Sequence, residues 1–313
     1  MNDVGRRSFE GPPRVALEPA GTRPWLVDAI EAGGGIVVPL AEAEAIVWAT
    51  PTGPQVLADA VASAPNTHWV QLPWAGIEPL VDVLDDSHLW TCGKGVYAEP
   101  VAEHVLMLAL AGLRGLADYG PASTWMGQHG QNLLGANLVI LGAGGITDSL
   151  LRLLGPFGCT ITVVRRRDDP IDGADLVITM DHLDGALATA DVVVLALSLT
   201  PETTGLFDAR RLSMMKPTAW LVNVARGGHI VTDDLVRALN EGVIGGAALD
   251  VTDPEPLPDG HPLWSTPNTI ITPHVGNTLE MAKPLLSARI TENVRRFATG
   301  EPLIGTVDLA SGY

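Results

Sequence analysis

The feature that most constrains the fold is a short apolar run, residues 138–141, that leads into a glycine-rich turn, Gly142-Ala143-Gly144-Gly145. A helical segment, residues 148–154, follows within three residues. A strand, a tight turn and a helix in this order are typical of βαβ units, which build parallel sheets. The order therefore predicts an α/β fold around this turn.

Short apolar runs recur along the whole chain, separated by helical stretches or loop residues. Alternating strands and helices predict parallel sheets, and runs that are apolar throughout predict sheets with both faces covered by helices. One long helix is predicted at 99–116, with Pro100 in its first turn. The predicted strands are residues 14–18, 36–40, 45–49, 67–72, 138–141, 160–164, 191–197, 220–224, 246–249 and 269–271.

Length and composition exclude several classes of protein. The 313 residues are enough for two domains of ordinary size, and 46% are hydrophobic, so the chain is globular rather than disordered. A net charge of −17 disfavours binding to nucleic acid or to anionic membranes. Cys92 and Cys159 are too few and too far apart for a disulfide framework or a metal site. The first 13 residues have no apolar core typical of a signal peptide, so we expect a cytoplasmic enzyme.

The glycine turn resembles a dinucleotide-binding fingerprint. Gly142 and Gly144 allow the tight turn and the close approach of a pyrophosphate, and a helix that starts near Ile146 offers its N–H groups to that anion. Thr147 stands where the fingerprint has a third small residue, which puts the geometry of the turn in question. A glycine-rich turn without a ligand is the alternative, but the preceding strand and following helix favour a nucleotide site.

The end of the next predicted strand bears on the choice of cofactor. NAD enzymes place an acidic residue there for the ribose 2′-hydroxyl, but this chain has Arg165, 23 residues after Gly142. Asp168 and Asp169 come three positions later. A guanidinium suits a 2′-phosphate, so we expect NADP(H) to be preferred, with NAD(H) possible. The alternative is a solvated basic turn.

Four further ionisable residues follow predicted strands or lie in a stiff loop. Arg226 ends a strand and can hold a carboxylate, although an isolated arginine is more often in a surface ion pair. His274 also follows a strand, and Glu255 lies between two prolines 19 residues earlier. If the two meet, the carboxylate orients the imidazole and favours its protonated form. Asp250 can bind an amide or simply cap the following turn.

These motifs together resemble the D-isomer-specific 2-hydroxyacid dehydrogenases, in particular the glyoxylate/hydroxypyruvate reductase branch. The order arginine, glutamate, histidine at these intervals is specific to that family, whereas the glycine turn is not. Formate dehydrogenases are similar, but they carry glutamine where this chain has Glu255. The matching segments are residues 98–105, 141–146, 199–206, 223–228, 248–251, 255–257 and 272–276.

The resemblance implies two Rossmann- or flavodoxin-like domains, each a doubly wound parallel sheet, with an inter-domain cleft. The substrate-binding domain would be discontinuous, residues 1–100 plus 281–313. The dinucleotide-binding domain would be residues 101–280. Members of the family are usually homodimers through the dinucleotide-binding domain, so a homodimer is expected here.

The resemblance also implies roles for residues at matching positions. Arg226 would hold the substrate carboxylate and carbonyl, His274 would be the acid–base residue, and Glu255 its partner. The positions matched to cofactor contacts are Gly142, Gly144, Gly145, Ile146, Arg165, the Leu197 backbone, the Val224 carbonyl and Asp250. Those matched to the substrate pocket are Trp48, Ala75 and Gly76.

The predicted function is therefore an NAD(P)-dependent oxidoreductase that transfers a hydride between the nicotinamide and a small 2-keto or 2-hydroxy acid. A nucleotide-sensing corepressor on the same fold is the alternative, because such proteins keep the same three residues. The acidic net charge and the absence of an extra tail favour the enzyme.

Overall fold

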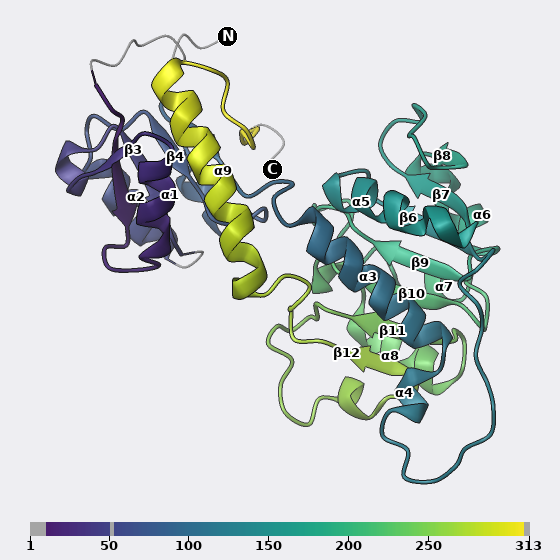
Figure 1. Ribbon diagram of the computed structural model, residues 1–313. Coiled ribbons are helices and arrows are strands. Elements are labelled where there is room, and N and C mark those ends of the chain that lie inside the picture. Colours follow the sequence, from purple (N-terminus) through teal and green to yellow (C-terminus); the bar gives the residue numbers. More distant parts are fainter. Residues whose placement is uncertain (1–10, 51–52, 310–313) are drawn as a thin grey trace. The chain divides into compact units, whose positions relative to one another are not determined.

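The computed structural model describes residues 11–50 and 53–309 (Figure 1). Contacts within the chain divide it into two compact units, Met1–Tyr97 with Thr278–Tyr313, and Ala98–Asn277. Each unit has its own parallel sheet. The predicted division near residues 100 and 280 into a substrate-binding and a dinucleotide-binding domain stays a prediction.

The first unit is built on a five-stranded parallel sheet in the order β2-β1-β3-β4-β5. Helices α1 and α9 lie side by side in this unit (Figure 1). Its strands are β1 (Arg14–Glu18), β2 (Ile36–Val37), β3 (Ala45–Trp48), β4 (Trp69–Gln71) and β5 (Leu89–Thr91). Its helices are α1 (Trp25–Ala32), α2 (Pro54–Ala62) and α9 (Leu279–Thr299).

A buried polar network attaches α9 to the middle of this sheet. The amide of Asn293 on α9 donates to the side-chain oxygen of Gln71 on β4 at 2.8 Å, and the Thr91 hydroxyl donates to the same oxygen at 2.9 Å. The Trp69 indole donates to Thr91 at 2.8 Å, and the Trp69 ring packs 5.2 Å from Phe297. The buried side chains of this network thus bond to one another, which is the condition for burying polar groups without a large cost.

The second unit is built on a seven-stranded parallel sheet in the order β12-β11-β10-β9-β6-β7-β8. The chain runs from β6 outward to β8 and then returns to β9 on the other side, so the direction of strand addition reverses between β6 and β9. Ligands bind at such reversal points, outside the carboxyl ends of the strands. The strands are β6 (Asn137–Leu141), β7 (Thr160–Val164), β8 (Leu176–Ile178), β9 (Val192–Leu195), β10 (Trp220–Asn223), β11 (Gly246–Leu249) and β12 (Thr269–Ile271).

Alternate residues of these strands enter two hydrophobic cores, one on each face of the sheet. On β9, Val192 and Val194 pack with α3 and α5, whereas Val193 and Leu195 pack with α6, α7 and α8. Burial of both faces explains why the strands read as continuous apolar runs. The helices are α3 (Ala98–Leu113), α4 (Leu116–Tyr119), α5 (Gly145–Leu154), α6 (Leu183–Leu187), α7 (Ala209–Leu212) and α8 (Thr232–Asn240).

The prediction of two doubly wound parallel sheets is confirmed, but the single helix predicted at 99–116 is wrong. Helix α3 ends at Leu113, and α4 begins at Leu116 after Gly115, whose φ of +68° is left-handed. Glycine adopts this conformation without strain, so the break falls there. Across the described ranges, none of the helices combines the length and the apolar character needed to cross a membrane.

Candidate active site

Three predicted site residues, two catalytic and one cofactor-binding, follow three adjacent strands of the second unit. Arg226 lies three residues beyond the end of β10, Asp250 directly follows β11, and His274 lies three residues beyond β12. Because β10, β11 and β12 are neighbours and parallel, their carboxyl ends meet at one edge of the sheet. The topology therefore gathers the three side chains at the edge where α/β sheets bind ligands.

The structure brings His274 and Glu255 into direct contact. The His274 Nδ1 atom lies 2.7 Å from Glu255 Oε1, and the two side chains are 54% and 40% exposed. A carboxylate can only accept, so Nδ1 carries the proton in this bond. The second ring nitrogen, Nε2, has no hydrogen-bond partner among the described residues and is free to exchange a proton.

The loop that carries Glu255 is held by bonds of its own. The Thr252 N–H donates to Glu255 Oε2 at 3.3 Å, so both carboxylate oxygens are engaged. The Thr252 hydroxyl donates to the Pro254 carbonyl at 2.8 Å, and the Thr232 hydroxyl donates to the Asp253 carbonyl at 2.7 Å. These contacts fix the direction from which the carboxylate meets the imidazole.

Asp250 is buried and collects four donors. Its Oδ1 accepts from the Thr272 hydroxyl at 2.6 Å and the Val275 N–H at 2.9 Å, and lies 3.2 Å from His104 Nε2. Its Oδ2 accepts from the Gly276 N–H at 2.9 Å. Burial alone would raise the pKa of Asp250, but these hydrogen bonds outweigh it and lower the pKa to about 2.

The same residue holds the backbone of His274. The His274 N–H donates to the Asp250 carbonyl at 2.8 Å, so three successive N–H groups, those of residues 274–276, point at Asp250. His274 has a φ of +53°, a left-handed conformation that costs a non-glycine residue about 1–3 kcal/mol. The bonds to Asp250 stabilise this strained turn. They therefore fix the position of the His274 backbone, from which the imidazole side chain extends.

Arg226 is placed by the buried amide of Asn223. The Asn223 side chain donates to the Arg226 carbonyl at 2.9 Å and accepts from the Ala225 N–H at 3.0 Å. The next residue, Gly227, must be a glycine, because a Cβ there would lie 2.0 Å from the Thr252 carbonyl group. The Arg226 guanidinium donates to the Ala225 carbonyl at 2.7 Å and is half-buried.

The predicted nucleotide turn has the required geometry. Gly142 has a φ of +108°, and a Cβ there would lie 2.1 Å from the Ala196 carbonyl oxygen, so only glycine fits. A Cβ on Gly144, by contrast, would meet nothing within 4 Å. The first intrahelical bond of α5 runs from the Asp148 N–H to the Gly144 carbonyl, so the N–H groups of Gly145 and Ile146 precede it and are available to an anion.

Thr147, the departure from the fingerprint, fits into the turn. Its side chain is fully buried, and its hydroxyl donates to the Gly142 carbonyl at 2.9 Å. This bond links the first turn of α5 to the strand end. The hydroxyl therefore takes up a carbonyl that the tight turn would leave without a partner.

Arg165 directly follows β7, the strand beside the glycine turn. No acidic residue of the described chain forms an ion pair with it, whereas Arg167 pairs with Asp169 at 3.3 Å. Asp169 is therefore paired with Arg167 rather than with Arg165. The position after the strand, where an NAD enzyme has an acidic residue, is occupied by the guanidinium-bearing Arg165.

Leu197 and Val224 follow β9 and β10, on the other side of the reversal point from β7. The carbonyl of Leu197 lies 3.2 Å from Nε2 of the fully buried His229, whose Nδ1 lies 3.0 Å from the Thr203 carbonyl. His229 thus links two loops at the carboxyl edge.

The three predicted substrate residues lie in the first unit. Trp48 ends β3 and is buried in its hydrophobic core. Ala75 and Gly76 lie in the loop after β4, with Ala75 exposed and Gly76 half-buried. The N–H groups of Ala75 and Gly76 donate to no acceptor among the described residues, which leaves them available to a carboxylate.

Sequence reasoning assigned no role to His104, Thr272 or His229, although all three make contacts that shape the site. His104 lies on α3 and Thr272 directly follows β12, yet their side chains meet at 3.0 Å. Both lie in segments that resemble the family, and that was the one available signal. Spacing alone gives no sign of the contact.

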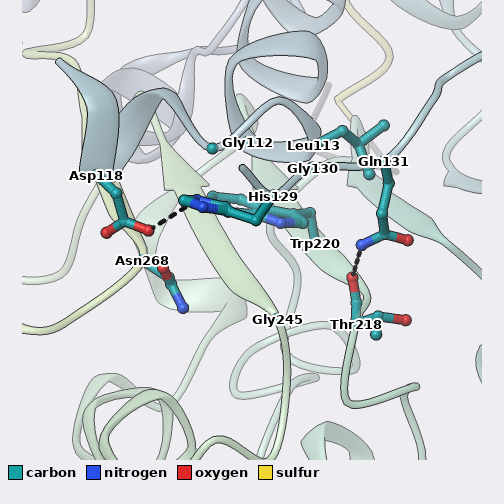
Figure 2. A pocket seen from close by; sticks show the side chains of 11 residues that line it. Gly112, Leu113, Asp118, His129, Gly130, Gln131, Thr218, Trp220, Gly245 and Asn268 are labelled. Atoms are coloured by element: carbon teal, nitrogen blue, oxygen red, sulfur yellow. Dashed lines mark hydrogen bonds and ion pairs between the residues drawn. The ribbon is translucent and has the colours of Figure 1, made fainter. Parts of the chain in front are cut away.

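A separate hollow lies at the opposite, amino edge of the same sheet (Figure 2). Its volume is about 200 Å³, and it adjoins Trp220 at the start of β10. His129 Nε2 lies 3.1 Å from an Asp118 carboxylate oxygen there, and the Gln131 amide donates to the Thr218 carbonyl at 3.0 Å (Figure 2). Since all predicted site residues of this unit lie at the carboxyl edge, this hollow is distinct from the candidate active site.

Comparison with known proteins identifies the family. Residues 105–276, more than half of the chain, match the sequence profile of the D-isomer specific 2-hydroxyacid dehydrogenase, NAD binding domain. An uncharacterized protein from the proB 3′ region of Corynebacterium melassecola is 43% identical over 256 residues, which cover 79% of this chain and 84% of that protein. Glyoxylate/hydroxypyruvate reductase A of Yersinia enterocolitica is 32% identical over 186 residues, 59% of this chain and 58% of that enzyme.

Solved structures agree with this match. The D-isomer specific 2-hydroxyacid dehydrogenase of Xanthobacter autotrophicus Py2, in complex with NADPH and MES, is 28% identical and superposes with a TM-score of 0.83. The superposition covers 97% of this chain and 100% of that one. The resemblance drawn from the motifs is confirmed, and the chain belongs to the D-isomer specific 2-hydroxyacid dehydrogenases, oxidoreductases that work with NAD or NADP.

Proposed function

We propose that this protein is an NADPH-preferring reductase of small 2-keto acids of the glyoxylate and hydroxypyruvate type. The contact between His274 and Glu255 is the observation that carries the proposal. It fixes the proton on Nδ1 and leaves Nε2 for a substrate oxygen. A histidine held this way is suited to deliver a proton to a carbonyl that is being reduced.

The proposed role of His274 is that of general acid in reduction and general base in the reverse reaction. When bound, the reduced nicotinamide supplies the hydride. As the carbonyl carbon accepts it, His274 Nε2 gives its proton to the carbonyl oxygen, and the product is a 2-hydroxy acid. Glu255 stabilises the imidazolium before the transfer and orients the ring.

Arg226 is proposed to bind the substrate carboxylate and to polarise the adjacent carbonyl. Its guanidinium has five N–H donors in a planar fork, and one of them donates to the Ala225 carbonyl at 2.7 Å. Such a group holds a carboxylate through two parallel bonds and so fixes the orientation of the carbonyl. We also propose that the N–H groups of Ala75 and Gly76 bind a carboxylate and that Trp48 shapes the substrate pocket.

The residues around the glycine turn fit a dinucleotide. Gly144 leaves space beside the turn, and the N–H groups of Gly145 and Ile146 are available to a pyrophosphate. Arg165 supports a preference for a 2′-phosphate, hence NADPH. We propose that Leu197, the Val224 carbonyl and Asp250 line the ribose and nicotinamide. The Asp250 carboxylate already accepts four hydrogen bonds, so a further amide donor would share Oδ2 with Gly276.

The test is turnover of glyoxylate and hydroxypyruvate with NADPH. The reaction is monitored through the loss of NADPH absorbance. The hydroxypyruvate product should be the D isomer of glycerate, which chiral chromatography resolves. The matched control is His274→Asn, which keeps a polar side chain of similar size but offers no titratable nitrogen. No turnover of any small 2-keto acid by a folded protein that binds NADPH would refute the proposal.

The corepressor alternative is not favoured, because the named relative is a reductase. We further propose a substrate-binding role for the first unit, a cytoplasmic location and a homodimer formed through the second unit. Light scattering coupled to gel filtration tests the homodimer.

A further inference from the structure

Among the described residues of the first unit, the buried side-chain polar atoms that lack hydrogen-bond partners are all donors. They are Nε of Arg14, Nη1 of Arg23 and the indole Nε1 atoms of Trp48 and Trp74. A buried donor without an acceptor costs free energy, so a group of such donors calls for an acceptor. Arg14 already has one, because its guanidinium pairs with Glu42. The other three need a separate explanation.

These three donors follow consecutive strands. Arg23 lies five residues after β1, Trp48 is the last residue of β3, and Trp74 lies three residues after β4. The strands β1, β3 and β4 are adjacent and parallel, so the donors gather at the carboxyl edge of the sheet. That edge is where sheets of this kind bind ligands.

Arg23 and Trp74 are in direct contact. The guanidinium carbon of Arg23 lies 5.1 Å from the centre of the Trp74 ring, a cation–π geometry that fixes the charged group in place. No acidic side chain of the described residues forms an ion pair with Arg23. Burial lowers the pKa of Arg23, which an arginine tolerates without losing its charge. The guanidinium is therefore held in position with its charge uncompensated.

The surroundings reinforce the positive charge. The guanidinium of Arg289, which faces Tyr97 as Arg23 does, donates to the carbonyls of Cys92 and Lys94, at 3.2–3.3 Å, and forms no ion pair with an acidic residue in the described ranges. Tyr97 packs 5.5 Å from Trp74, and its hydroxyl is already used as a donor to the Pro73 carbonyl. Two guanidinium groups thus flank one aromatic cluster in a protein of net charge −17.

The backbone of Arg23 has a φ of +45°, in the left-handed region that non-glycine residues rarely adopt. Strain of this kind clusters at ligand sites, where the chain holds a side chain in a required direction.

We propose that Arg23, together with the indole N–H of Trp74, binds a second carboxylate of the substrate, so that the preferred substrates are 2-keto diacids. This inference rests on the proposed function, in which the N–H groups of Ala75 and Gly76 bind a carboxylate. Trp74 directly precedes that pair in the sequence. A substrate that carries two carboxylates offers one to each subsite.

The experiment compares substrates of equal length that differ only at the far end. The two pairs are 2-ketoglutarate with 2-ketovalerate, and oxaloacetate with 2-ketobutyrate, and glyoxylate is the short reference. A charge-assisted hydrogen bond predicts that kcat/KM favours the diacid of each pair by about 10- to 100-fold. Arg23→Gln should remove that preference and leave glyoxylate turnover little changed. Arg295→Gln is the control, because Arg295 is paired with Glu292 and Glu301 in the same unit.

Two kinetic outcomes would overturn the inference. Equal kcat/KM for diacid and monoacid in the wild type would show that no second carboxylate is bound. An equal loss for glyoxylate and for the diacids in Arg23→Gln would show that Arg23 binds the carboxylate common to all substrates. The melting temperature of each variant shows whether it is folded, and Arg23→Lys, which keeps the charge, should retain part of the preference.

A binding measurement separates this inference from the proposed function. Glutarate carries two carboxylates and no keto group, so its binding by calorimetry does not depend on catalysis. Binding to the wild type that is lost in Arg23→Gln would support the subsite even if no 2-keto acid were reduced. Equal binding to both proteins, or to neither, would refute it. Failure to reduce glyoxylate would refute the proposed function alone.

Discussion

His274 and Glu255 meet through a 2.7 Å bond between Nδ1 and Oε1, although 19 residues and a turn of the chain separate them. Both side chains are substantially exposed, so solvent screens the charge of the carboxylate. The contact therefore acts mainly through geometry, because it fixes the orientation of the imidazole ring. This relationship gives the first prediction.

Replacing Glu255 by glutamine should lower kcat while NADPH binding stays nearly intact. Glutamine keeps the shape and can still accept from Nδ1, but it lacks the negative charge that stabilises a positively charged ring during proton transfer. An exposed charge pair is worth up to about 1 kcal/mol, so the loss in kcat should be about 2- to 5-fold. High salt should shrink the difference between wild type and variant.

The loss of the imidazole itself should be far larger. General acid catalysis is typically worth about 10²–10⁴-fold, so His274→Asn should lose roughly that factor in kcat while NADPH binding stays nearly intact. If Glu255→Gln keeps the kcat of the wild type, the contact between Glu255 and His274 has no part in the proton transfer.

Arg226 should be irreplaceable by lysine. Loss of two charge-assisted bonds predicts that Arg226→Ala lowers kcat/KM by about 100-fold or more, with little effect on NADPH affinity. Arg226→Lys should recover little, because a point charge cannot replace the planar fork. Arg237→Ala is the matched control, since Arg237 is 62% exposed and pairs with Asp234 on the same helix. A lysine variant close to wild type would exclude the proposed clamp.

Arg165 should determine the preference between the two cofactors. The ratio of kcat/KM for NADPH to that for NADH should fall by about 10- to 100-fold in Arg165→Asp, because a charge-assisted contact with the 2′-phosphate is lost. Arg167→Gln is the control, since Arg167 is 75% exposed and pairs with Asp169. Rising salt should weaken NADPH more than NADH in the wild type. Equal use of both cofactors by the wild type would contradict the prediction.

Hydrophobic pattern and turn chemistry are local, which is why they predicted most of the fold. Nine of the ten predicted apolar runs contain the central residues of a strand, and β2 is shortened to Ile36–Val37. Two strands were not predicted, β5 (Leu89–Thr91) and β8 (Leu176–Ile178), because each is only three residues long and partly exposed at the edge of its sheet. The helix predicted at 99–116 also continued through Gly115, whose left-handed backbone separates α3 from α4.

Contacts between distant segments could not be predicted in the same way. The order of Arg226, Glu255 and His274 suggested a site because their strands are successive in the sequence. The contact between His104 and Thr272 joins residues 168 positions apart, and nothing in their spacing indicates it. The stacking of Arg23 on Trp74 likewise depends on which strands are neighbours in the sheet, and strand order is not written in the local sequence.

Asp250 should stabilise the fold in a way that depends on pH. Its folded pKa of about 2 lies below the ordinary value of 3.8 because four hydrogen bonds favour the charged form despite burial. A lowered pKa means that the stabilisation is fully present above pH 3.8 and is lost as the pH falls toward 2. Each pKa unit corresponds to about 1.4 kcal/mol, so the contribution is roughly 1–2 kcal/mol after allowance for solvent screening.

Asp250→Asn tests this through the free energy of unfolding. The amide would leave the N–H of Val275 or Gly276 facing another donor, so the variant should be less stable at neutral pH by about 1–3 kcal/mol. It should also lose kcat, because the turn that carries His274 is then held less firmly. The stability difference should stay constant from neutral pH down to about 5 and shrink below about 4, as the wild-type carboxylate takes up its proton. Asp59→Asn, at an exposed position of α2 where the carboxylate accepts only from Gln55, should show no such trend. A difference that stayed the same throughout the acid range would mean that the charge of Asp250 does not hold the turn, and that packing around His104 and Thr272 positions His274 instead.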